Sequence, residues 1–184
     1  MTQLGTRYQG AVAYAVRLHD GQVRKGTTIP YAAHLLAVSS LVLEAGGTEE
    51  QAIAGLLHDS LEDQGDRTSF EEIAERFGPE VARIVRACSD TEIVPKPPWT
   101  ERKKAYLAHL ESADEAVLRV SLADKLHNAR SIVSDLGAHG AELWGRFNQG
   151  REPQVWYYGR LAEVFRRRLP GMHAEELAEA VNRM

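Results

Sequence analysis

The stretch GLLHDSLEDQ, residues 55–64, joins an apolar helical run to four ionisable side chains. His58 and Asp59 follow the two leucines at once, and Glu62 and Asp63 come one turn later. Because side chains four positions apart share a face of a helix, the two pairs would crowd a narrow sector if the helix continued. The stretch therefore predicts either a solvated helix end or ionisable groups that converge on a ligand.

Outside this stretch, the hydrophobic pattern is helical nearly throughout. Apolar residues recur at three- and four-residue steps, and the sequence has no strand pattern longer than a few residues. Thr48 with Gln51 and Ser69 with Glu72 are capping signals, and Pro79 suits a first helical position. The pattern predicts an all-α fold with a Pro-rich connector at 89–99. The expected helices cover about 6–19, 31–45, 48 through the charged stretch, 70–77, 79–89, 100–112 and 114–136, with two more inside 141–184.

Length and composition limit the class of protein. With 184 residues, 43% hydrophobic and 26% charged, the chain is most simply one globular domain over residues 1–184. A net charge of −4 argues against a general nucleic-acid-binding protein. No run approaches the ~18 apolar residues of a membrane span, and the N-terminus lacks the apolar part of a signal peptide. The single cysteine fits a reducing compartment. We expect a cytoplasmic protein without nucleic-acid or membrane partners, and its oligomeric state stays open.

Two further segments place ligand-type side chains among apolar residues. PYAAHLLAV, residues 30–38, contains His34, and SLADKLHNARS, residues 121–131, carries Asp124 with Asn128 one turn later. An unpaired carboxylate on an apolar helical face is costly to bury unless it is paired or bound to a metal. Two histidines and two aspartates form a mixed nitrogen and oxygen set, which suits Mn²⁺, Fe²⁺ or Zn²⁺ better than Ca²⁺. That set is His34, His58, Asp59 and Asp124.

Each of these residues also has an interpretation without a ligand. His34 could be a satisfied core histidine, and Asp124 could pair with Lys125 or Arg130. The acidic pair after the His-Asp dipeptide could be solvent-facing loop charge. Each interpretation is reasonable alone, but all must hold together in one helical chain for the set to have no function.

The order His34, His58-Asp59, Asp124 resembles the H…HD…D pattern of the HD-domain metal-dependent phosphohydrolases. Four segments extend the likeness: HDGQVRKGTTIPYAAHLLAV (19–38), AGLLHDSLEDQ (54–64), FEEIAERFGPEVARIV (70–85) and LADKLHNARS (122–131). Over roughly residues 8–136 they look like the hydrolase domain of RelA/SpoT proteins and of the small alarmone hydrolases. The resemblance implies a compact multi-helix HD-domain bundle, with the C-terminal helices of 141–184 beyond the matching part.

The resemblance also implies a metal centre. Its four ligands would be the two histidines and two aspartates named above, and the ion would be Mn²⁺, as is usual in the family, or another divalent transition metal. Glu62 and Asp63 match the acidic pair that positions or deprotonates the attacking water. This agrees with general chemistry, since a divalent cation lowers the pKa of water and a nearby carboxylate can take the proton. Glu62, one turn from His58, is expected to be placed for this proton transfer.

The remaining implied roles concern the substrate. Arg24 and Lys25 match the basic pair of the nucleotide pocket, and Asn128 matches a residue that contacts the substrate near the metal. The implied reaction is hydrolysis of the 3′-pyrophosphate of (p)ppGpp to GDP or GTP plus pyrophosphate. Because this chain is too short to hold a synthetase domain as well, we expect it to degrade the alarmone and not to synthesise it. Two alternatives stay open: a metal-dependent hydrolase of an adenine alarmone or a nucleoside monophosphate, and a module that senses an alarmone without hydrolysing it. Tyr31 is expected in the core, and His19 and His127 are expected to be structural or at the surface.

Overall fold

The computed structural model describes residues 2–89 and 95–184. Within these residues every regular element is a helix, and the extended pairing is limited to an isolated antiparallel bridge between Val23 and Pro30. The predicted all-α fold is confirmed. The helices are α1 (Thr6–Leu18), α2 (Ala32–Glu44), α3 (Glu49–Leu57), α4 (Ser60–Asp63), α5 (Phe70–Phe77), α6 (Pro79–Cys88), α7 (Trp99–Leu110), α8 (Glu115–His139), the 3₁₀ helix η1 (Gly140–Arg146), α9 (Arg151–Arg168) and α10 (Met172–Val181).

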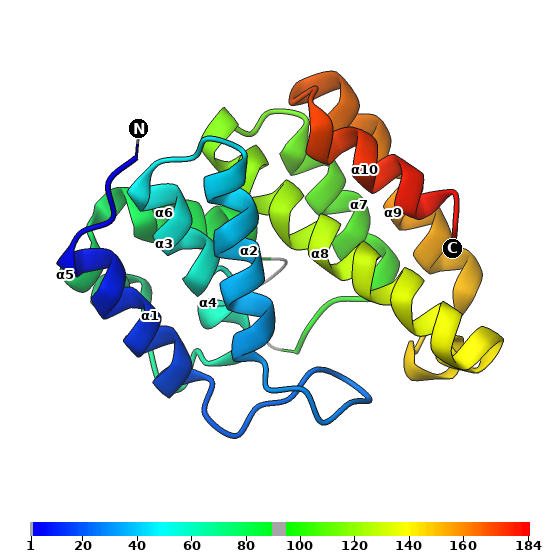
Figure 1. The fold of residues 1–184 in the computed structure, drawn as a ribbon, viewed down its shortest axis with the longest axis horizontal. Coiled ribbons are helices and arrows are strands. Elements are labelled where there is room, and N and C mark those ends of the chain that lie inside the picture. The colour runs from blue at the N-terminus through cyan, green and yellow to red at the C-terminus, as the bar shows by residue number, and fades with distance from the viewer. Residues whose placement is uncertain (1, 90–94) are drawn as a thin grey trace.

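Helix α8 is the central element of the bundle (Figure 1). It packs against α2, α3 and α6 on one side and against α9 and α10 on the other. Leu35, Leu57 and Leu126 are completely or almost completely buried in the core that these helices enclose. Burial of each such side chain contributes about 1.5–3 kcal/mol. Leu35 follows His34 and Leu57 precedes His58, so the contacts that hold the core also fix the backbone next to the candidate ligands.

The sequence signals for helix ends act as expected in most places. Thr48 and Gln51 form a reciprocal capping box at the start of α3, and the hydroxyl of Ser69 accepts a hydrogen bond from the backbone of Glu72. Asp114 caps α8 in the same way, through Val117 N. These caps fix where the helices that carry the site begin.

The helix predicted to run from residue 48 through the charged stretch is interrupted, which corrects the sequence interpretation. Helix α3 ends at Leu57, and α4 begins only at Ser60. His58 and Asp59 lie in the intervening turn, with Asp59 at φ −95° and ψ −2°. A regular helix would keep both side chains on the α3 surface, whereas the turn lets both reach the same point.

The predicted end of the long helix at Gly137 is also wrong. Helix α8 continues to His139, and Gly140 ends it with φ 59°. A glycine inside a helix costs only about 1 kcal/mol relative to alanine, so packing of the flanking turns against η1 and α10 can keep Gly137 helical. The two predicted C-terminal helices are present as α9 and α10. Of the Pro-rich connector, residues 90–94 lie outside the described part of the chain.

Helix α3 lies unusually close to α2 because of Gly55. A Cβ atom added there would come within 3.2 Å of the Cα atom of Ser39, which is a tighter contact than side chains normally make. The missing side chain lets the end of α3 approach α2 and brings His58 next to His34. In the described residues, no helix combines the length and the apolarity needed to cross a bilayer.

Candidate metal centre and adjoining cleft

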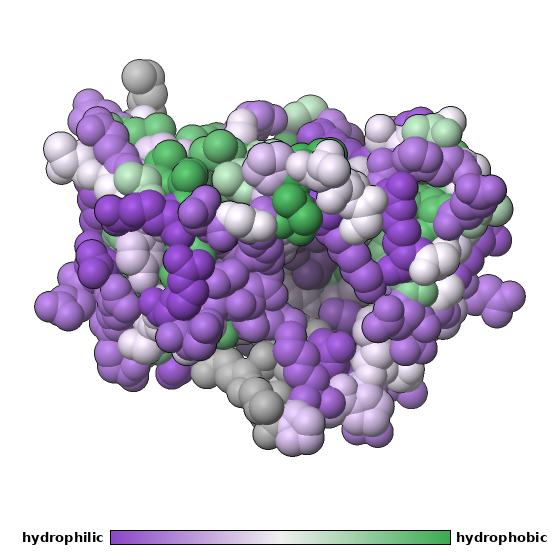
Figure 2. All heavy atoms as spheres, turned by 90° about the horizontal axis from the view of Figure 1, so that it is seen from below, coloured by the Kyte–Doolittle hydropathy of each residue, from purple (hydrophilic) through white to green (hydrophobic). Residues whose placement is uncertain are grey.

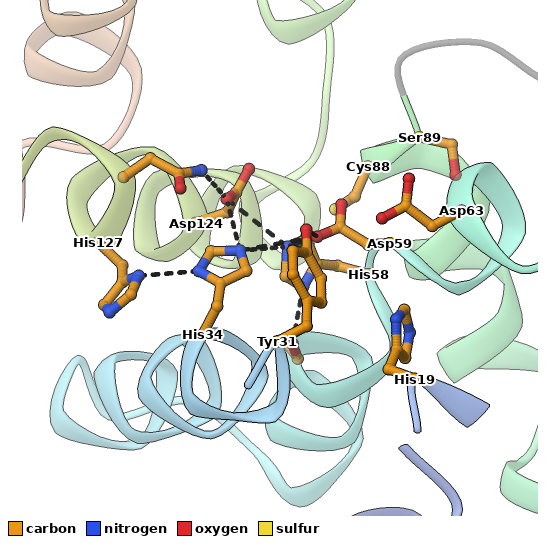
Figure 3. Close-up of polar contacts among 12 residues, drawn as sticks. His19, Tyr31, His34, His58, Asp59, Asp63, Cys88, Ser89, Asp124 and His127 are labelled. Atoms are coloured by element: carbon orange, nitrogen blue, oxygen red, sulfur yellow. Dashed lines mark hydrogen bonds and ion pairs between the residues drawn. The ribbon is translucent and has the colours of Figure 1, made fainter. Parts of the chain in front are cut away.

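Four side chains from three separate parts of the chain meet at one point (Figure 3). His34 comes from the first turn of α2, His58 and Asp59 from the turn after α3, and Asp124 from the middle of α8. The Nε2 atoms of the two histidines are 3.2 Å apart. Asp59 Oδ2 lies 3.0 Å from His58 Nε2 and 3.6 Å from His34 Nε2. Asp124 Oδ1 lies 3.3 Å from His34 Nε2 and 3.6 Å from His58 Nε2.

These distances fit the coordination shell of a single divalent cation. Ligands at about 2.0–2.2 Å from an ion in tetrahedral or octahedral geometry lie roughly 3–3.6 Å from one another. The ligand atoms of His34, His58 and Asp59 all lie within 4.8 Å of one another, and Asp124 Oδ1 approaches both imidazoles as closely as Asp59 does. The residues present therefore suit a metal with mixed nitrogen and oxygen ligands.

The electrostatics of the cluster favour positive charge at its centre. Burial alone would lower the pKa of His58, but the charge of Asp59 and a hydrogen bond with Asp124 outweigh it and raise that pKa well above its ordinary value. Burial opposes ionisation of Asp59 and Asp124 as well, yet the pKa of each stays well below normal because of the cations beside it. For Asp124 the main such cation is Lys125. A divalent cation at the centre of the cluster would supply the positive charge that the proton of His58 supplies in its absence.

Two backbone and side-chain contacts orient the imidazoles. His58 Nδ1 donates to the carbonyl oxygen of Gly55 at 2.8 Å, which turns Nε2 toward the centre of the cluster, where a cation can take the place of its hydrogen. His34 Nδ1 lies 2.8 Å from His127 Nδ1. Contacts of this kind fix the tautomer and the ring direction of metal-binding histidines.

The carboxylates are oriented by three further contacts. Tyr31 donates from its hydroxyl to Asp59 Oδ2 at 2.5 Å. Lys125 Nζ donates to Asp124 Oδ2 at 2.5 Å, and Asn128 Nδ2 donates to Asp124 Oδ1 at 2.6 Å. The pairing of Asp124 with Lys125 was the structural alternative to metal binding in the sequence. Asp124 can pair with Lys125 and bind a metal at the same time, because Oδ2 contacts the lysine and Oδ1 faces the two imidazoles.

The acidic pair after the His-Asp dipeptide separates in space. Glu62 forms an ion pair with Lys96 at 2.8 Å. Asp63 accepts a hydrogen bond from Gln22 Nε2 at 2.9 Å and lies on the side of the cluster where Asp59 is seen in Figure 3. Its side chain is open to solvent, but desolvation by its surroundings and the charge of Asp59 raise its pKa. Asp63 is therefore the acidic residue whose proton affinity is tuned by the cluster.

Three residues without a role in the sequence interpretation belong to the surroundings of the cluster. Tyr31 contacts Asp59, His127 contacts His34, and His19 is buried with its ring stacked on Tyr31 at 5.3 Å between centroids. A signal for two of them was present. Tyr31 is three residues before His34, and His127 is three residues after Asp124, so each shares a helical face with a candidate ligand.

A cleft of about 650 Å³ adjoins the cluster. Tyr31, His127 and Asn128 line it, so these residues form its boundary with the cluster. Figure 2 shows that the face on this side of the molecule is hollowed between mainly hydrophilic side chains. The charged residues that line the cleft are Arg24, Lys25, Arg130, Asp135 and Arg146.

The predicted substrate residues are brought to this cleft. Arg24 donates from Nη2 to Asn128 Oδ1 at 2.9 Å, and Asn128 in turn contacts Asp124. Lys25, which lines the cleft, donates from Nζ to Asn148 Oδ1 at 3.2 Å. A continuous chain of hydrogen bonds thus connects the basic lining of the cleft to the cluster.

A model of the HD domain matches residues 11–149. The chain belongs to the HD-domain family. It is 37% identical over 125 residues to the guanosine-3′,5′-bis(diphosphate) 3′-pyrophosphohydrolase MESH1 of Xenopus tropicalis, an alignment that covers 66% of this chain and 67% of that protein. It is 39% identical over 126 residues to the guanosine-3′,5′-bis(diphosphate) 3′-pyrophosphohydrolase of Aquifex aeolicus (strain VF5), covering 67% of this chain but only 17% of that longer protein.

The similarity to solved structures covers nearly the whole chain, including the C-terminal helices beyond the HD-domain match. A structure of a metazoan ortholog of SpoT that hydrolyses ppGpp superposes with a TM-score of 0.81 at 26% identity, covering 99% of this chain and 97% of that one. A Listeria monocytogenes EGD-e protein superposes with a TM-score of 0.72 at 28% identity, covering 81% and 96%. The predicted HD-domain family and its RelA/SpoT-type branch are confirmed. Hydrolases of this family depend on a metal, which agrees with the candidate site at His34, His58 and Asp59.

Proposed function

We propose that the protein hydrolyses the 3′-pyrophosphate of ppGpp and pppGpp, releasing pyrophosphate and GDP or GTP. The observation that carries the proposal is the position of Asn128. It donates to Asp124 of the cluster and accepts from Arg24 of the cleft, so one side chain joins a site for a cation to a site for an anion. A nucleotide with a 3′-pyrophosphate needs both, and the relatives named above carry this activity in their names.

We propose Mn²⁺ as the cation, held by His34, His58, Asp59 and Asp124. Two imidazoles and two carboxylates suit such a borderline ion, and HD hydrolases are metal-dependent. When bound, it supplies acidity to water and neutralises charge that develops on the phosphoryl oxygens.

The chain's own residues position the other participants. Arg24, Lys25 and Asn128 bind and orient the nucleotide from the cleft, where Arg130 and Arg146 add positive charge. Asp63 takes the proton of the attacking water, and the amide of Gln22 orients its carboxylate. Glu62, paired with Lys96, is the second acidic residue and helps to position that water. Positioning and charge complementarity account for most of the rate in phosphoryl transfer.

Replacement of Asp63 by Asn is expected to lower kcat by roughly 10²–10⁴-fold, because the general base is lost while the shape of the side chain is kept. KM and Mn²⁺ affinity are expected to change little. Desolvation and the charge of Asp59 raise the pKa of Asp63 in the metal-free protein. Since only the carboxylate accepts a proton, kcat of the wild type is expected to fall as the pH drops through the pKa of Asp63. A kcat against pH profile checks this. An unchanged acidic limb in the Asn variant would rule out Asp63 as the base.

Replacement of Arg24 by Met is expected to raise KM for ppGpp about tenfold or more, with a smaller effect on kcat. The change removes a cation from the cleft and frees the amide of Asn128, but leaves the four candidate ligands in place. One charge-assisted hydrogen bond is worth about 1.5–3 kcal/mol. Steady-state kinetics check the result, with Arg76→Met on the remote helix α5 as a matched control. Equal KM values for both variants would place the nucleotide elsewhere.

A substrate panel tests the proposed function as a whole. Purified protein is incubated with Mn²⁺ or with a chelator, and with ppGpp, pppGpp, pppApp, NADPH or a deoxynucleoside monophosphate. The proposal expects metal-dependent pyrophosphate release from ppGpp and pppGpp, and poor turnover of monophosphates. Preference for pppApp or for a monophosphate would assign the site to the alternative nucleotide. Tight binding of ppGpp without turnover across several metals would make the protein a sensor.

A further inference from the structure

His127 lies between the metal cluster and the cleft. Its Nδ1 atom is 2.8 Å from Nδ1 of His34, with the ring centroids 4.9 Å apart and the planes tilted by 40°. The same residue lines the cleft beside Arg24 and Asn128. It therefore contacts a candidate metal ligand and also lines the cleft.

The hydrogen bond between the two rings fixes their tautomers. One hydrogen must lie between the two nitrogens. A histidine that binds a cation through Nε2 carries its hydrogen on Nδ1, so His34 is the donor and His127 Nδ1 is the acceptor. Because Nδ1 of His127 accepts this hydrogen bond, it carries no hydrogen of its own. Its single hydrogen is consequently on Nε2.

The Nε2–H group of His127 is free to meet a ligand. Among the described residues it has no hydrogen-bond partner, and it is absent from the buried polar atoms that lack one. Figure 3 shows this nitrogen on the side of the ring turned away from His34. His127 is half-buried and is one of the residues that line the cleft.

We propose that His127 is a positioning residue that couples the two sites. It orients His34 for the cation through Nδ1, and it donates from Nε2–H to an acceptor oxygen of the bound nucleotide. The identity of the cleft ligand rests on the proposed function. Because hydrogen bonds in a chain polarise one another, a nucleotide that accepts from Nε2–H makes Nδ1 a better acceptor and His34 a stronger ligand. Coupling of this kind is reciprocal, so the cation also strengthens nucleotide binding.

Two substitutions separate the two contacts. In His127→Leu both are lost. In His127→Asn the Oδ1 atom can replace Nδ1 as the acceptor for His34, but nothing replaces Nε2–H. His109→Leu, at an exposed histidine of α7 away from the cleft, is the matched control. Circular dichroism and thermal unfolding establish that each variant is folded.

The experiment measures Mn²⁺ affinity of the chelator-treated protein and GDP affinity at saturating Mn²⁺, both by calorimetry. His127→Leu is expected to weaken Mn²⁺ binding by roughly 10–100-fold, as for other partners of metal-binding histidines. His127→Asn is expected to keep Mn²⁺ affinity within about threefold of the wild type, while GDP affinity falls about tenfold, the usual effect of losing one such contact. The control changes neither value.

Each arm can overturn the proposal separately. Wild-type Mn²⁺ affinity in a folded His127→Leu protein removes the link to His34, and wild-type GDP affinity in both His127 variants removes the link to the nucleotide. The Mn²⁺ arm uses the metal alone and does not depend on the nucleotide. Failure of the wild-type protein to bind GDP contradicts the proposed function and the cleft contact, but leaves the result for His34 standing on its own measurement.

Discussion

Asp59→Ala is expected to abolish stoichiometric Mn²⁺ binding and to reduce pyrophosphate release by at least ~10³-fold, which corresponds to about 4 kcal/mol of transition-state stabilisation. Asp59 Oδ2 is within 3.6 Å of both candidate imidazole ligands, and its removal leaves Asp124 as the one carboxylate of the set. That remaining carboxylate already shares its charge with Lys125. The cluster then lacks the negative charge that a divalent cation requires.

Calorimetric Mn²⁺ titration and a pyrophosphate-release assay check this expectation. Asp66→Ala is a matched control, since it removes an exposed carboxylate seven positions further along the chain. The proposed metal centre would be wrong if the Asp59 variant bound one Mn²⁺ per chain with wild-type affinity. Loss of turnover with intact Mn²⁺ binding would instead make Asp59 a substrate-side residue.

Asp124→Leu is expected to destabilise the metal-free protein by roughly 3 kcal/mol as well as to prevent metal binding. The side chains of Asp124 and Lys125 are only 8% and 16% exposed, and their pairing distance is 2.5 Å. Without the aspartate, the ammonium group stays largely buried without its anion. Because removal of one partner of a buried pair is the costly change, removal of both costs much less.

The double variant Asp124→Leu with Lys125→Met separates stability from metal binding. It is expected to recover most of the lost free energy of unfolding, measured by urea denaturation in the presence of a chelator, and still to bind no Mn²⁺. The chelator is needed because a ligand that binds the native state adds its own stabilisation. Equal stability of the single variant and the wild type would show that Lys125 does not depend on Asp124. Mn²⁺ binding by the double variant would exclude Asp124 from the ligand set.

Most of the helices could be predicted from the sequence because they are local patterns, and the ordered motif of ligand-type residues could be recognised, while its role as a metal site stays a prediction. Capping residues such as Thr48 and Asp114 mark helix starts, and the His-Asp dipeptide with His34 and Asp124 forms a recognisable ordered motif. The four ionisable side chains of residues 55–64 do not all behave alike. His58 and Asp59 converge on the cluster, whereas the acidic pair beyond them meets Lys96 and Gln22.

The features that sequence reasoning missed depend on tertiary geometry. The turn between α3 and α4 directs both His58 and Asp59 to one point, and no residue type in that stretch signals the break in the helix. Tyr31 acquires its contact with Asp59 only when α2 is packed against the end of α3, and His127 acquires its contact with His34 only when α2 and α8 are packed together. Their three-residue spacing from His34 and Asp124 was a visible signal, but it identifies a shared helical face and not a contact across helices.

Diffraction from crystals grown with Mn²⁺, measured for the anomalous signal of manganese, tests the central claim most directly. The expected result is one strong peak, with His34 Nε2, His58 Nε2 and one oxygen each of Asp59 and Asp124 at about 2.0–2.3 Å from it. A Mn²⁺-saturated crystal without a peak between these four side chains, or with its peak elsewhere, would contradict the account.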